Sequence, residues 1–543
     1  MNRGKNLQKL REETFDICVI GAGATGAGVA LDAALRGFRV ALIEKEDFAS
    51  ETSSKSTKLI HGGVRYLEQA FKNLDFGQLK QVRHGLAERH FVLSNAPHLA
   101  RPLGIITPVF SWFEGLYFSI GLVMYGWFAK NDTLPKARWL SKKETLDRIK
   151  NMSSRIHSGV LYYDGQLDDA RYCLALVQSA DKAGAAVANY TEVLGFEKEA
   201  SGQLTAVKVR ERNSGDVFSI KSRLFINCTG VFSDKIRLMA NPQEVPRIRP
   251  SKGVHIILKK EYLNGSEAIL IPKTKDGRVV FVIPFEGIVM VGTTDTPDNR
   301  TDAEPVLESA EVDYLLETIS PFLNKVPAKS EVQAGFGGLR PLLAANRKDT
   351  KSLLRDHEIE HDHASNLLSV LGGKWTTFRL MAQDAVDEAC RILETERTCK
   401  TPDHKLHGAD KAGDGQSELE ELTTKSGISE ESVIHLKSKY GDQAGAVLAL
   451  CEDNTGLAAL IHKDYPYIKA EALYAARYEM AVTLRDFFAR RIRFELTDWQ
   501  ATIDSVETVA LIMAGELLWD ESFTKNQIED YRKQLGNFIS EAS

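Results

Sequence analysis

Cysteine is sparse in this chain and gives no sign of a disulfide framework. The six cysteines among 543 residues lie too far apart for paired metal-ligand spacings and are too few to staple a chain of this length. Basic charge is not in surplus either, because 69 lysines and arginines face 74 aspartates and glutamates, for a net charge of −5. These absences exclude a disulfide-stapled fold and a global attraction for nucleic acid, and they predict reduced thiols in a cytosolic setting.

Long apolar runs are missing as well. The N-terminus, MNRGKNLQKLREE, is polar and has no apolar core of a secretory signal. The most apolar window, residues 116–129, is shorter than the roughly 20 residues that a spanning helix needs. We expect this window to form a buried or partly buried helix, with contact to a membrane surface as the alternative.

What is present is a globular composition of 43% hydrophobic and 26% charged residues, at a length that predicts two or three structural units.

The chain opens with a βαβ pattern. Residues 15–20, FDICVI, are typical of a buried strand, and the glycine-rich stretch GAGATGAG follows at once. Helix-forming residues then continue to Arg36, and residues 38–43 predict a second strand that ends on Glu44.

The glycines of this unit have the G-x-G-x-x-G spacing of a dinucleotide site. Gly21 allows a tight turn off the strand, Gly23 lets backbone N–H groups approach a pyrophosphate, and Gly26 lets the helix pack close to the sheet. Glu44 is placed to accept hydrogen bonds from an adenosine ribose. The pattern predicts dinucleotide binding, but it fits NAD and FAD equally well.

Other segments combine glycine with polar residues. The segment TSSKSTKLIHGGVRYLE, residues 52–68, reads as a loop entering a helix, whose first three hydroxyl residues suit either helix capping or a pyrophosphate. Residues 372–374, GGK, lie between a strand-like run and a helix, so a helix N-terminus points at whatever lies over the turn. Residues 224–230 predict another strand that ends in a glycine turn, and residues 278–294 predict a β-hairpin.

These segments, together with GTTD at 292–295, GLRPL at 338–342 and GGKWTT at 372–377, occur in the order seen in FAD-dependent glycerol-3-phosphate dehydrogenases. The chain resembles that family over most of residues 14–393 and into its C-terminal region. The α-glycerophosphate oxidases are similar but usually carry an extra insertion before the C-terminal domain, which this sequence lacks. The resemblance therefore favours a dehydrogenase.

The resemblance implies an α/β fold of the amino-acid-oxidase type. A Rossmann-like FAD domain would be assembled from residues 14–64, 165–240 and 340–393. A β-rich substrate domain, mainly residues 65–164 and 241–339, would be inserted between these pieces. The two would form an oxidoreductase core over residues 1–395, followed by a helical C-terminal domain over residues 396–543.

The resemblance also implies the cofactor, FAD, and no metal. Joined with the motifs above, it gives a set of cofactor-binding candidates from five stretches of the chain: Gly21, Gly23, Gly26 and Glu44; Thr52, Ser53, Ser54, Gly62 and Gly63; Val187; Thr229 and Gly230; and Gly372, Gly373, Lys374, Trp375 and Thr376.

The implied substrate is sn-glycerol 3-phosphate, oxidised by hydride transfer from C2 to the flavin. Arginine suits the phosphate because its guanidinium offers several planar donors. The substrate-binding candidates at family positions or beside them are Arg65, Tyr66, Arg340, Arg355, Lys374 and Thr294. His61 is the leading candidate for the base and His255 the second, and each has the alternative of being an ordinary structural histidine.

The sequence has no haem motif or iron–sulfur spacing, so an external electron acceptor is expected, and the family implies a membrane quinone. We therefore expect a cytoplasmic protein that attaches peripherally to the inner face of a membrane. A homodimer is one assembly that it could form, but the sequence does not determine the oligomeric state. The alternatives are an oxidase that passes electrons to oxygen and a non-catalytic flavin-binding sensor.

The C-terminal segment 477–494 interleaves Arg485, Arg490, Arg491 and Arg493 with phenylalanines. Such a segment can lie on anionic lipid. We favour instead a helix that buries its phenylalanines and exposes its arginines to solvent.

Overall fold

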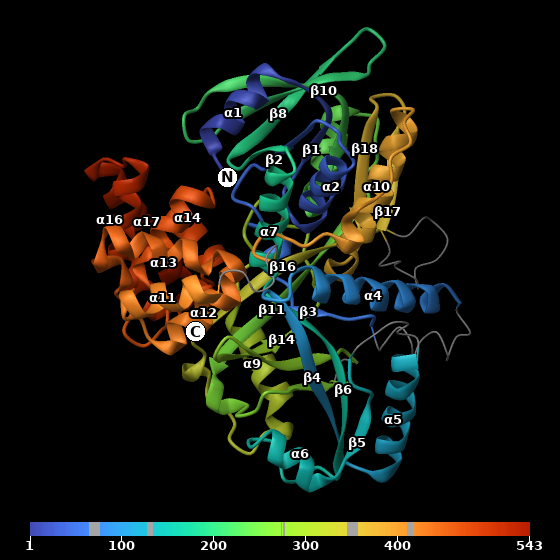
Figure 1. The fold of residues 1–543 in the computed structure, drawn as a ribbon. Helices are drawn as coiled ribbons and strands as arrows, with labels where there is room; N and C mark the ends of the chain where they lie inside the picture. The colour runs from blue at the N-terminus through green and yellow to red at the C-terminus, as the bar shows by residue number, and fades with distance from the viewer. Residues whose placement is uncertain (64–75, 128–133, 273, 275–276, 345–356, 410–415) are drawn as a thin grey trace.

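The computed structural model describes residues 1–63, 76–127, 134–272, 274, 277–344, 357–409 and 416–543 (Figure 1). These residues form two β-sheets, each with its own helices, and a group of C-terminal helices packed against both. The predicted α/β fold with a helical C-terminal domain is confirmed.

The first sheet has eight strands and is parallel at its centre. Its order is β17-β18-β10-β1-β2-β7, with β9 beside β10 and β8 beside β9. The strands are β1 (Thr14–Ile20), β2 (Val40–Ile43), β7 (Ala186–Ala188), β8 (Thr191–Lys198), β9 (Leu204–Glu211), β10 (Val217–Asn227), β17 (His357–Asp362) and β18 (Leu367–Gly372). The central strands are apolar on both faces because helices cover both sides of the sheet.

Helices α2 (Ala24–Leu35), α7 (Asp169–Lys182) and α10 (Phe378–Ile392) pack together on one face of this sheet, and α1 (Arg3–Glu12) and α8 (Ser233–Ala240) lie on the other. The strand β1, the helix α2 and the parallel strand β2 confirm the predicted βαβ unit. The strand predicted within residues 224–230 is the end of β10, which pairs with β1, and β7 pairs with β2 in the same sheet.

The second sheet has ten strands in the order β15-β11-β14-β13-β12-β4-β6-β3, with β16 also on β11 and β5 also on β6. The strands are β3 (Leu59–Ile60), β4 (Ala100–Val109), β5 (Arg138–Leu140), β6 (Ser158–Leu167), β11 (Ile248–Lys259), β12 (Ala268–Ile271), β13 (Val280–Phe285), β14 (Ile288–Gly292), β15 (Thr296–Pro297) and β16 (Ala334–Leu343). The hairpin predicted within residues 278–294 is confirmed as β13 and β14. The helices α4 (Phe76–Asn95), α5 (Trp112–Trp127), α6 (Lys142–Arg148) and α9 (Ser309–Ile319) belong to this part of the molecule.

The C-terminal part consists of α11 (Gln416–Ser426), α12 (Glu430–Tyr440), α13 (Ala444–Asp453), α14 (Lys469–Tyr478), α15 (Phe494–Thr497), α16 (Trp499–Leu517) and α17 (Glu521–Ala542). A π-helical turn, Asp486–Arg491, lies between α14 and α15. These helices form one body on one side of the two sheets (Figure 1).

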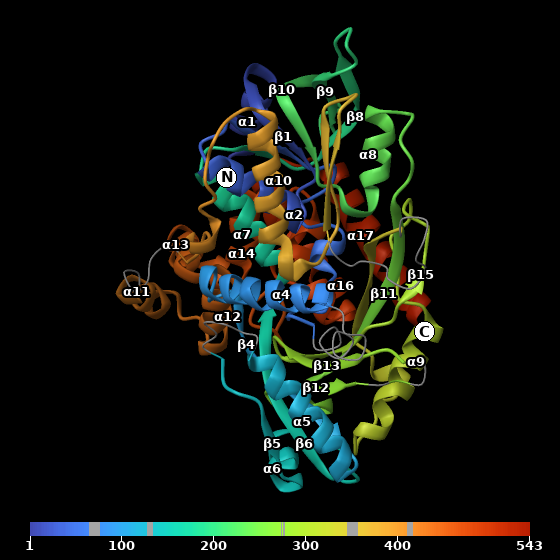
Figure 2. The same ribbon diagram turned by 90° about the vertical axis from the view of Figure 1, so that its right-hand side faces the viewer.

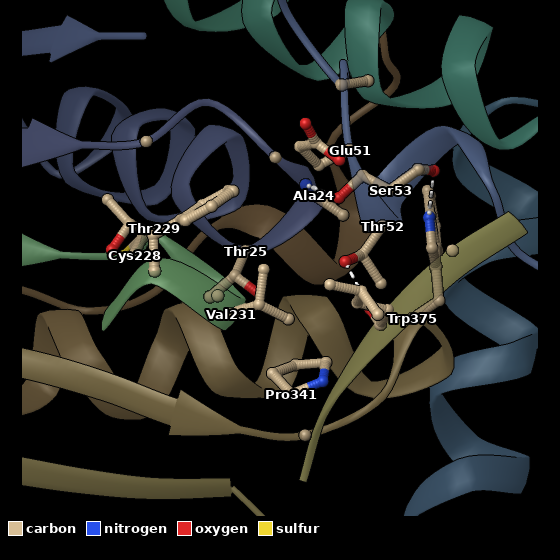
Figure 3. Close-up of a pocket in the computed structure, with 18 of the residues that line it drawn as sticks. Ala24, Thr25, Glu51, Thr52, Ser53, Cys228, Thr229, Val231, Pro341 and Trp375 are labelled. Atoms are coloured by element: carbon tan, nitrogen blue, oxygen red, sulfur yellow. Dashed lines mark hydrogen bonds between the residues drawn. The ribbon is translucent and has the colours of Figure 1, made fainter. Parts of the chain in front are cut away.

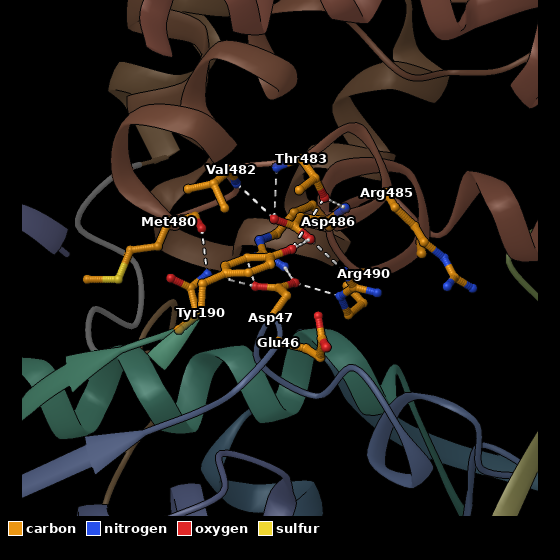
Figure 4. A network of polar contacts seen from close by, with 12 residues as sticks. Glu46, Asp47, Tyr190, Met480, Val482, Thr483, Arg485, Asp486 and Arg490 are labelled. Carbon is orange, nitrogen blue, oxygen red and sulfur yellow. Dashed lines mark hydrogen bonds and ion pairs between the residues drawn. The ribbon is translucent and has the colours of Figure 1, made fainter. Parts of the chain in front are cut away.

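The arginines of this turn are buried, which corrects the prediction that they face solvent. Arg490 donates to Asp47 Oδ2 at 2.5 Å, and Arg491 reaches both oxygens of Asp47 at 2.8 and 2.9 Å. Tyr190 donates from its hydroxyl to Asp486 Oδ1 at 2.7 Å (Figure 4). Burial alone would raise the pKa of Asp47, but Arg491 and Arg490 lower it to about 2. The predicted burial of the phenylalanines is confirmed, whereas the arginines join the C-terminal helices to the loop after β2.

The apolar window yields α5, which is buried on one side only. Leu122 and Tyr125 lie in the core, so the prediction of a partly buried helix is confirmed. The opposite side exposes Trp112 (54%), Phe113 (78%) and Ile120 (54%) to solvent. With β5 and α6, this helix lies at the lower end of the molecule in both views (Figure 1, Figure 2). None of the described helices is both long and apolar enough to cross a bilayer.

Candidate active site

A cavity of about 390 Å³ lies where the two sheets meet. Its walls come from the turn after β1, the end of β2, the 49–57 loop, the turn after β10, strand β16 and the turn after β18 (Figure 3). The carboxyl ends of the central parallel strands therefore open into it, as expected for a nucleotide site in a doubly wound sheet.

The glycines of the first turn allow a close approach of backbone segments. Gly21 has φ +98°, and a Cβ there would lie 2.8 Å from the carbonyl oxygen of Cys228. A Cβ on Gly26 would lie only 1.8 Å from the carbonyl oxygen of Gly21, so any side chain would push α2 away from the strand. At the N-terminus of α2, the Ala24 N–H donates to Ser53 Oγ at 2.9 Å (Figure 3). This corner has the N–H donors and the open backbone that a pyrophosphate needs.

Glu44 stands at the end of β2 and faces the cavity. One carboxylate oxygen accepts the N–H of Ala22 at 2.8 Å and the other accepts the N–H of Glu46 at 3.1 Å. Burial raises the pKa of Glu44, while these two N–H groups oppose the rise. The backbone thus fixes the carboxylate where it can accept ribose hydroxyl hydrogen bonds.

Two hydrogen bonds join the 52–54 loop to distant parts of the chain. Thr52 Oγ1 donates to the carbonyl of Leu339 at 2.6 Å, and the indole N–H of Trp375 donates to the carbonyl of Ser53 at 2.9 Å (Figure 3). Gly372 and Gly373 have φ of +70° and +88°, which supports the sharp turn before Trp375. The loop, strand β16 and the turn after β18 therefore form one continuous wall.

Arg340 projects from β16 into the same cavity. It donates through Nη1 to Asp295 Oδ1 at 3.2 Å and through Nη2 to Thr293 Oγ1 and the Thr294 carbonyl, both at 3.0 Å. Its guanidinium lies over Gly253, where a Cβ would come within 2.2 Å of Nη2. The GTTD segment and a glycine of β11 therefore set the position of this cation.

Two histidines line the cavity. His255 on β11 stacks on Phe336, with ring centroids 4.7 Å apart, and its Nε2 lies 3.1 Å from Thr57 Oγ1. Burial lowers the pKa of His255 well below its usual value, and Lys58 and Arg340 lower it further, so the imidazole is neutral at pH 7. His61 directly follows β3, and its backbone N–H lies 3.4 Å from Thr376 Oγ1.

Comparisons with known proteins agree with this site. Residues 16–386 match the family model described as FAD dependent oxidoreductase, and residues 399–523 match the C-terminal domain of alpha-glycerophosphate oxidase. A mitochondrial glycerol-3-phosphate dehydrogenase of Arabidopsis thaliana is 38% identical over 97% of this chain and 87% of its own length. The chain belongs to the FAD-dependent glycerol-3-phosphate dehydrogenase family.

Other members of the glycerol-3-phosphate dehydrogenase family extend the match. The mitochondrial enzyme of Homo sapiens is 36% identical over 96% of this chain and 73% of its own length. The crystal structure of the glycerol-3-phosphate dehydrogenase from Bacillus halodurans complexed with FAD superimposes with a TM-score of 0.79 at 28% identity, over 98% of this chain and 96% of that one. The close glycine turns and the fixed Glu44 carboxylate fit FAD, as the family requires.

Most of the predicted cofactor-binding residues meet in the cavity. The lining includes Gly21, Gly23, Glu44, Thr52, Ser53, Thr229, Gly230, Gly372, Gly373, Lys374, Trp375 and Thr376, together with His61, His255 and Arg340. Their individual roles stay predictions. Arg65, Tyr66 and Arg355 lie outside the described residues.

Six predicted residues are not part of the cavity lining. Gly26 packs α2 on the strand, and the Ser54 carbonyl accepts hydrogen bonds from Lys58 and Arg493 at 2.8 Å each. The Gly62 N–H bonds to Tyr125, Gly63 has φ +85°, and Val187 is buried within β7. Thr294 is also behind the lining, where its hydroxyl accepts the N–H of Val254 at 3.1 Å and its carbonyl holds Arg340.

Some lining residues were missed by sequence reasoning. Thr57 contacts His255, and residues 191–193 face the cavity near the end of β7. Thr57 belongs to the TSSKSTK segment, so that motif could have indicated it as a lining residue. No motif indicates residues 191–193, because their placement depends on how β7 pairs with β2.

Proposed function

We propose that this protein oxidises sn-glycerol 3-phosphate to dihydroxyacetone phosphate and passes the electrons to a membrane quinone. The observation that carries the proposal is that one cavity combines a dinucleotide-binding turn, an arginine held by four acceptors and two histidines. The family's relatives named above point to the same substrate.

Arg340 would bind the substrate phosphate, with Lys374 as further positive charge in the same wall. Because Asp295 and the Thr293–Thr294 segment already orient the guanidinium, little side-chain entropy is lost when an anion arrives. FAD, when bound, would accept the hydride from C2. Clamping the phosphate orients that carbon and excludes water around it.

The C2 hydroxyl proton needs an acceptor, and His61 is the first candidate. His255 is the second, and its neutral imidazole is supported by the low pKa described above. Arg340 and Lys58 would disfavour an imidazolium at position 255, which makes His255 suited to orienting a hydroxyl group and His61 the better proton acceptor.

Stopped-flow bleaching of the flavin by glycerol 3-phosphate tests the substrate assignment. The wild-type holoenzyme should bleach without oxygen, and Arg340→Ala should raise the half-saturating substrate concentration while FAD stays bound. Quinone and oxygen are then offered separately to the reduced enzyme. Reoxidation by oxygen at the turnover rate, with hydrogen peroxide formed, would replace the dehydrogenase with an oxidase, and absence of bleaching would refute the substrate.

A quinone acceptor requires access to a membrane, and the exposed side of α5 supports peripheral attachment there. Trp112, Phe113 and Tyr117 suit the interfacial region of a bilayer. The neighbouring segment exposes four basic side chains that suit anionic lipid, namely Lys136, Arg138, Lys142 and Lys143.

Co-sedimentation with lipid vesicles tests this attachment. The protein should bind vesicles that contain phosphatidylglycerol, and the double variant Trp112→Ser/Phe113→Ser should lose most of that binding. Leu511→Ser, which removes a 66% exposed apolar side chain from α16, is the matched control. Equal binding by both variants and the wild type would refute the α5 surface.

A further inference from the structure

A buried polar cluster lies directly behind the His61 loop and has no part in the chemistry described so far. Tyr125 comes from α5, Asp164 from β6 and Arg89 from α4, and all three side chains are buried. Arg89 donates to Asp164 Oδ1 in a short contact and to the carbonyl of Tyr163 at 3.2 Å. Three elements thus fix one carboxylate beneath the site.

Tyr125 connects this carboxylate to the loop. Its hydroxyl donates to Asp164 Oδ1 at 3.1 Å and accepts the N–H of Gly62 at 2.7 Å. Burial raises the pKa of Tyr125 well above its usual value, and the charge of Asp164 raises it further, so the hydroxyl keeps its proton. The direction of both hydrogen bonds is therefore set.

The backbone at Gly62 is tightly packed against α4. A Cβ there would lie 2.8 Å from Leu86 Cγ and 3.0 Å from the carbonyl oxygen of Val82. On α4, a Cβ at Gly85 would lie 2.8 Å from Gly62 Cα. The loop backbone is thus pressed against α4, and the Tyr125 hydroxyl fixes its rotation through the Gly62 peptide.

We propose that Tyr125 is a positioning residue for substrate oxidation, which holds the His61–Gly62 peptide so that His61 points into the cavity. The proposal rests on the function proposed above. His61 lines the cavity, whereas Tyr125 is not part of the lining and contacts the site only through the Gly62 peptide. A misplaced acceptor slows proton transfer strongly but leaves the phosphate-binding Arg340 unaffected.

The test is Tyr125→Phe in the FAD-loaded enzyme, followed by stopped-flow flavin reduction over a range of glycerol 3-phosphate concentrations. We expect the limiting rate constant to fall about tenfold, with less than a twofold change in half-saturating concentration and no loss of FAD. Tyr162→Phe is the matched control, because Tyr162 is equally buried and packs edge-on against Tyr125 with ring centroids 6.3 Å apart.

Amide hydrogen exchange of a peptide covering residues 59–62 is the second measurement, and it should accelerate in Tyr125→Phe alone. An unchanged limiting rate constant, or an equal fall in Tyr162→Phe, overturns the proposal. Loss of FAD or of the fold together with activity also overturns it, since Tyr125 would then be merely structural. A wild-type enzyme that glycerol 3-phosphate does not bleach defeats the proposed function itself, and this result is seen before any variant is compared.

Discussion

Gly253 should control the position of Arg340 because it has no side chain. The glycine lies on β11, beside the β16 strand that carries Arg340. In Gly253→Ala the new Cβ would lie 2.2 Å from Arg340 Nη2 and 2.6 Å from Cζ. Because contacts below about 3.0 Å are essentially never seen for a Cβ atom, the guanidinium has to move by about 0.8 Å or more.

This displacement of the guanidinium should weaken substrate binding. Arg340 makes bonds of 3.0 to 3.2 Å to Thr293, Thr294 and Asp295, and these bonds place its remaining donors. A hydrogen bond to a charged group contributes about 1.5–3 kcal/mol, so losing one to the phosphate should raise the half-saturating substrate concentration about 10- to 150-fold. Fold stability should change little, since the displaced group is the end of a flexible side chain.

Stopped-flow flavin reduction measures this effect directly, with bound FAD quantified from the absorption spectrum. Gly195→Ala on β8 is the control, because a Cβ there would meet nothing within 4 Å. An unchanged half-saturating concentration in Gly253→Ala would refute both the role of Arg340 and the reasoning from its position. Loss of FAD in Gly253→Ala would instead show that β11 supports the cofactor.

Three further outcomes are expected. Gly26→Ala should purify with little FAD, as judged by its flavin absorption, because its Cβ would collide with the Gly21 carbonyl at 1.8 Å; full flavin content would contradict this. Asp47→Ala should lose about 3–5 kcal/mol in urea unfolding because the buried Arg490 and Arg491 lose the carboxylate that they share, whereas Asp216→Ala, which breaks an exposed pair, should lose less than about 1 kcal/mol. The pKa of Asp47 is lowered to about 2 in the folded protein, so its stabilising contribution should be complete above its unfolded pKa of about 4. That contribution should be lost as the pH falls from about 4 to 2. Acid unfolding of Asp47→Asn that matches the wild type in this window would contradict the assignment.

The dinucleotide half of the site could be predicted from sequence because its determinants are local. Strand, glycine turn, helix and second strand follow one another within residues 14–44, so spacing alone constrains their geometry. The wall formed by Thr52, Leu339 and Trp375 could not be derived in this way. Its hydrogen bonds join residues 287 and 322 positions apart, and only the resemblance to a known family brought those segments together.

The wrong expectation about the arginines and the exposed side of α5 have the same physical origin. Hydrophobic pattern predicts burial for apolar residues and exposure for charged ones, yet Arg491 is fully buried against Asp47, and Phe113 on α5 is 78% exposed. A buried arginine needs a carboxylate from elsewhere in the chain, here 444 positions away. The position of that carboxylate, like the exposure of Phe113, cannot be read from a local window of sequence.

The buried arginines connect the C-terminal domain to two loops of the candidate cofactor site. Asp47 follows the ribose-binding candidate Glu44 by three residues and is held by Arg490 and Arg491. Arg493 donates to the carbonyl of Ser54, the residue after the one that meets the N-terminus of α2. Both loops that would contact FAD are thus fixed from behind by one short segment. Removing residues 396–543 would take away the arginines that hold Asp47 and Ser54, so we infer that cofactor binding depends on this domain as well as on the Rossmann-like sheet.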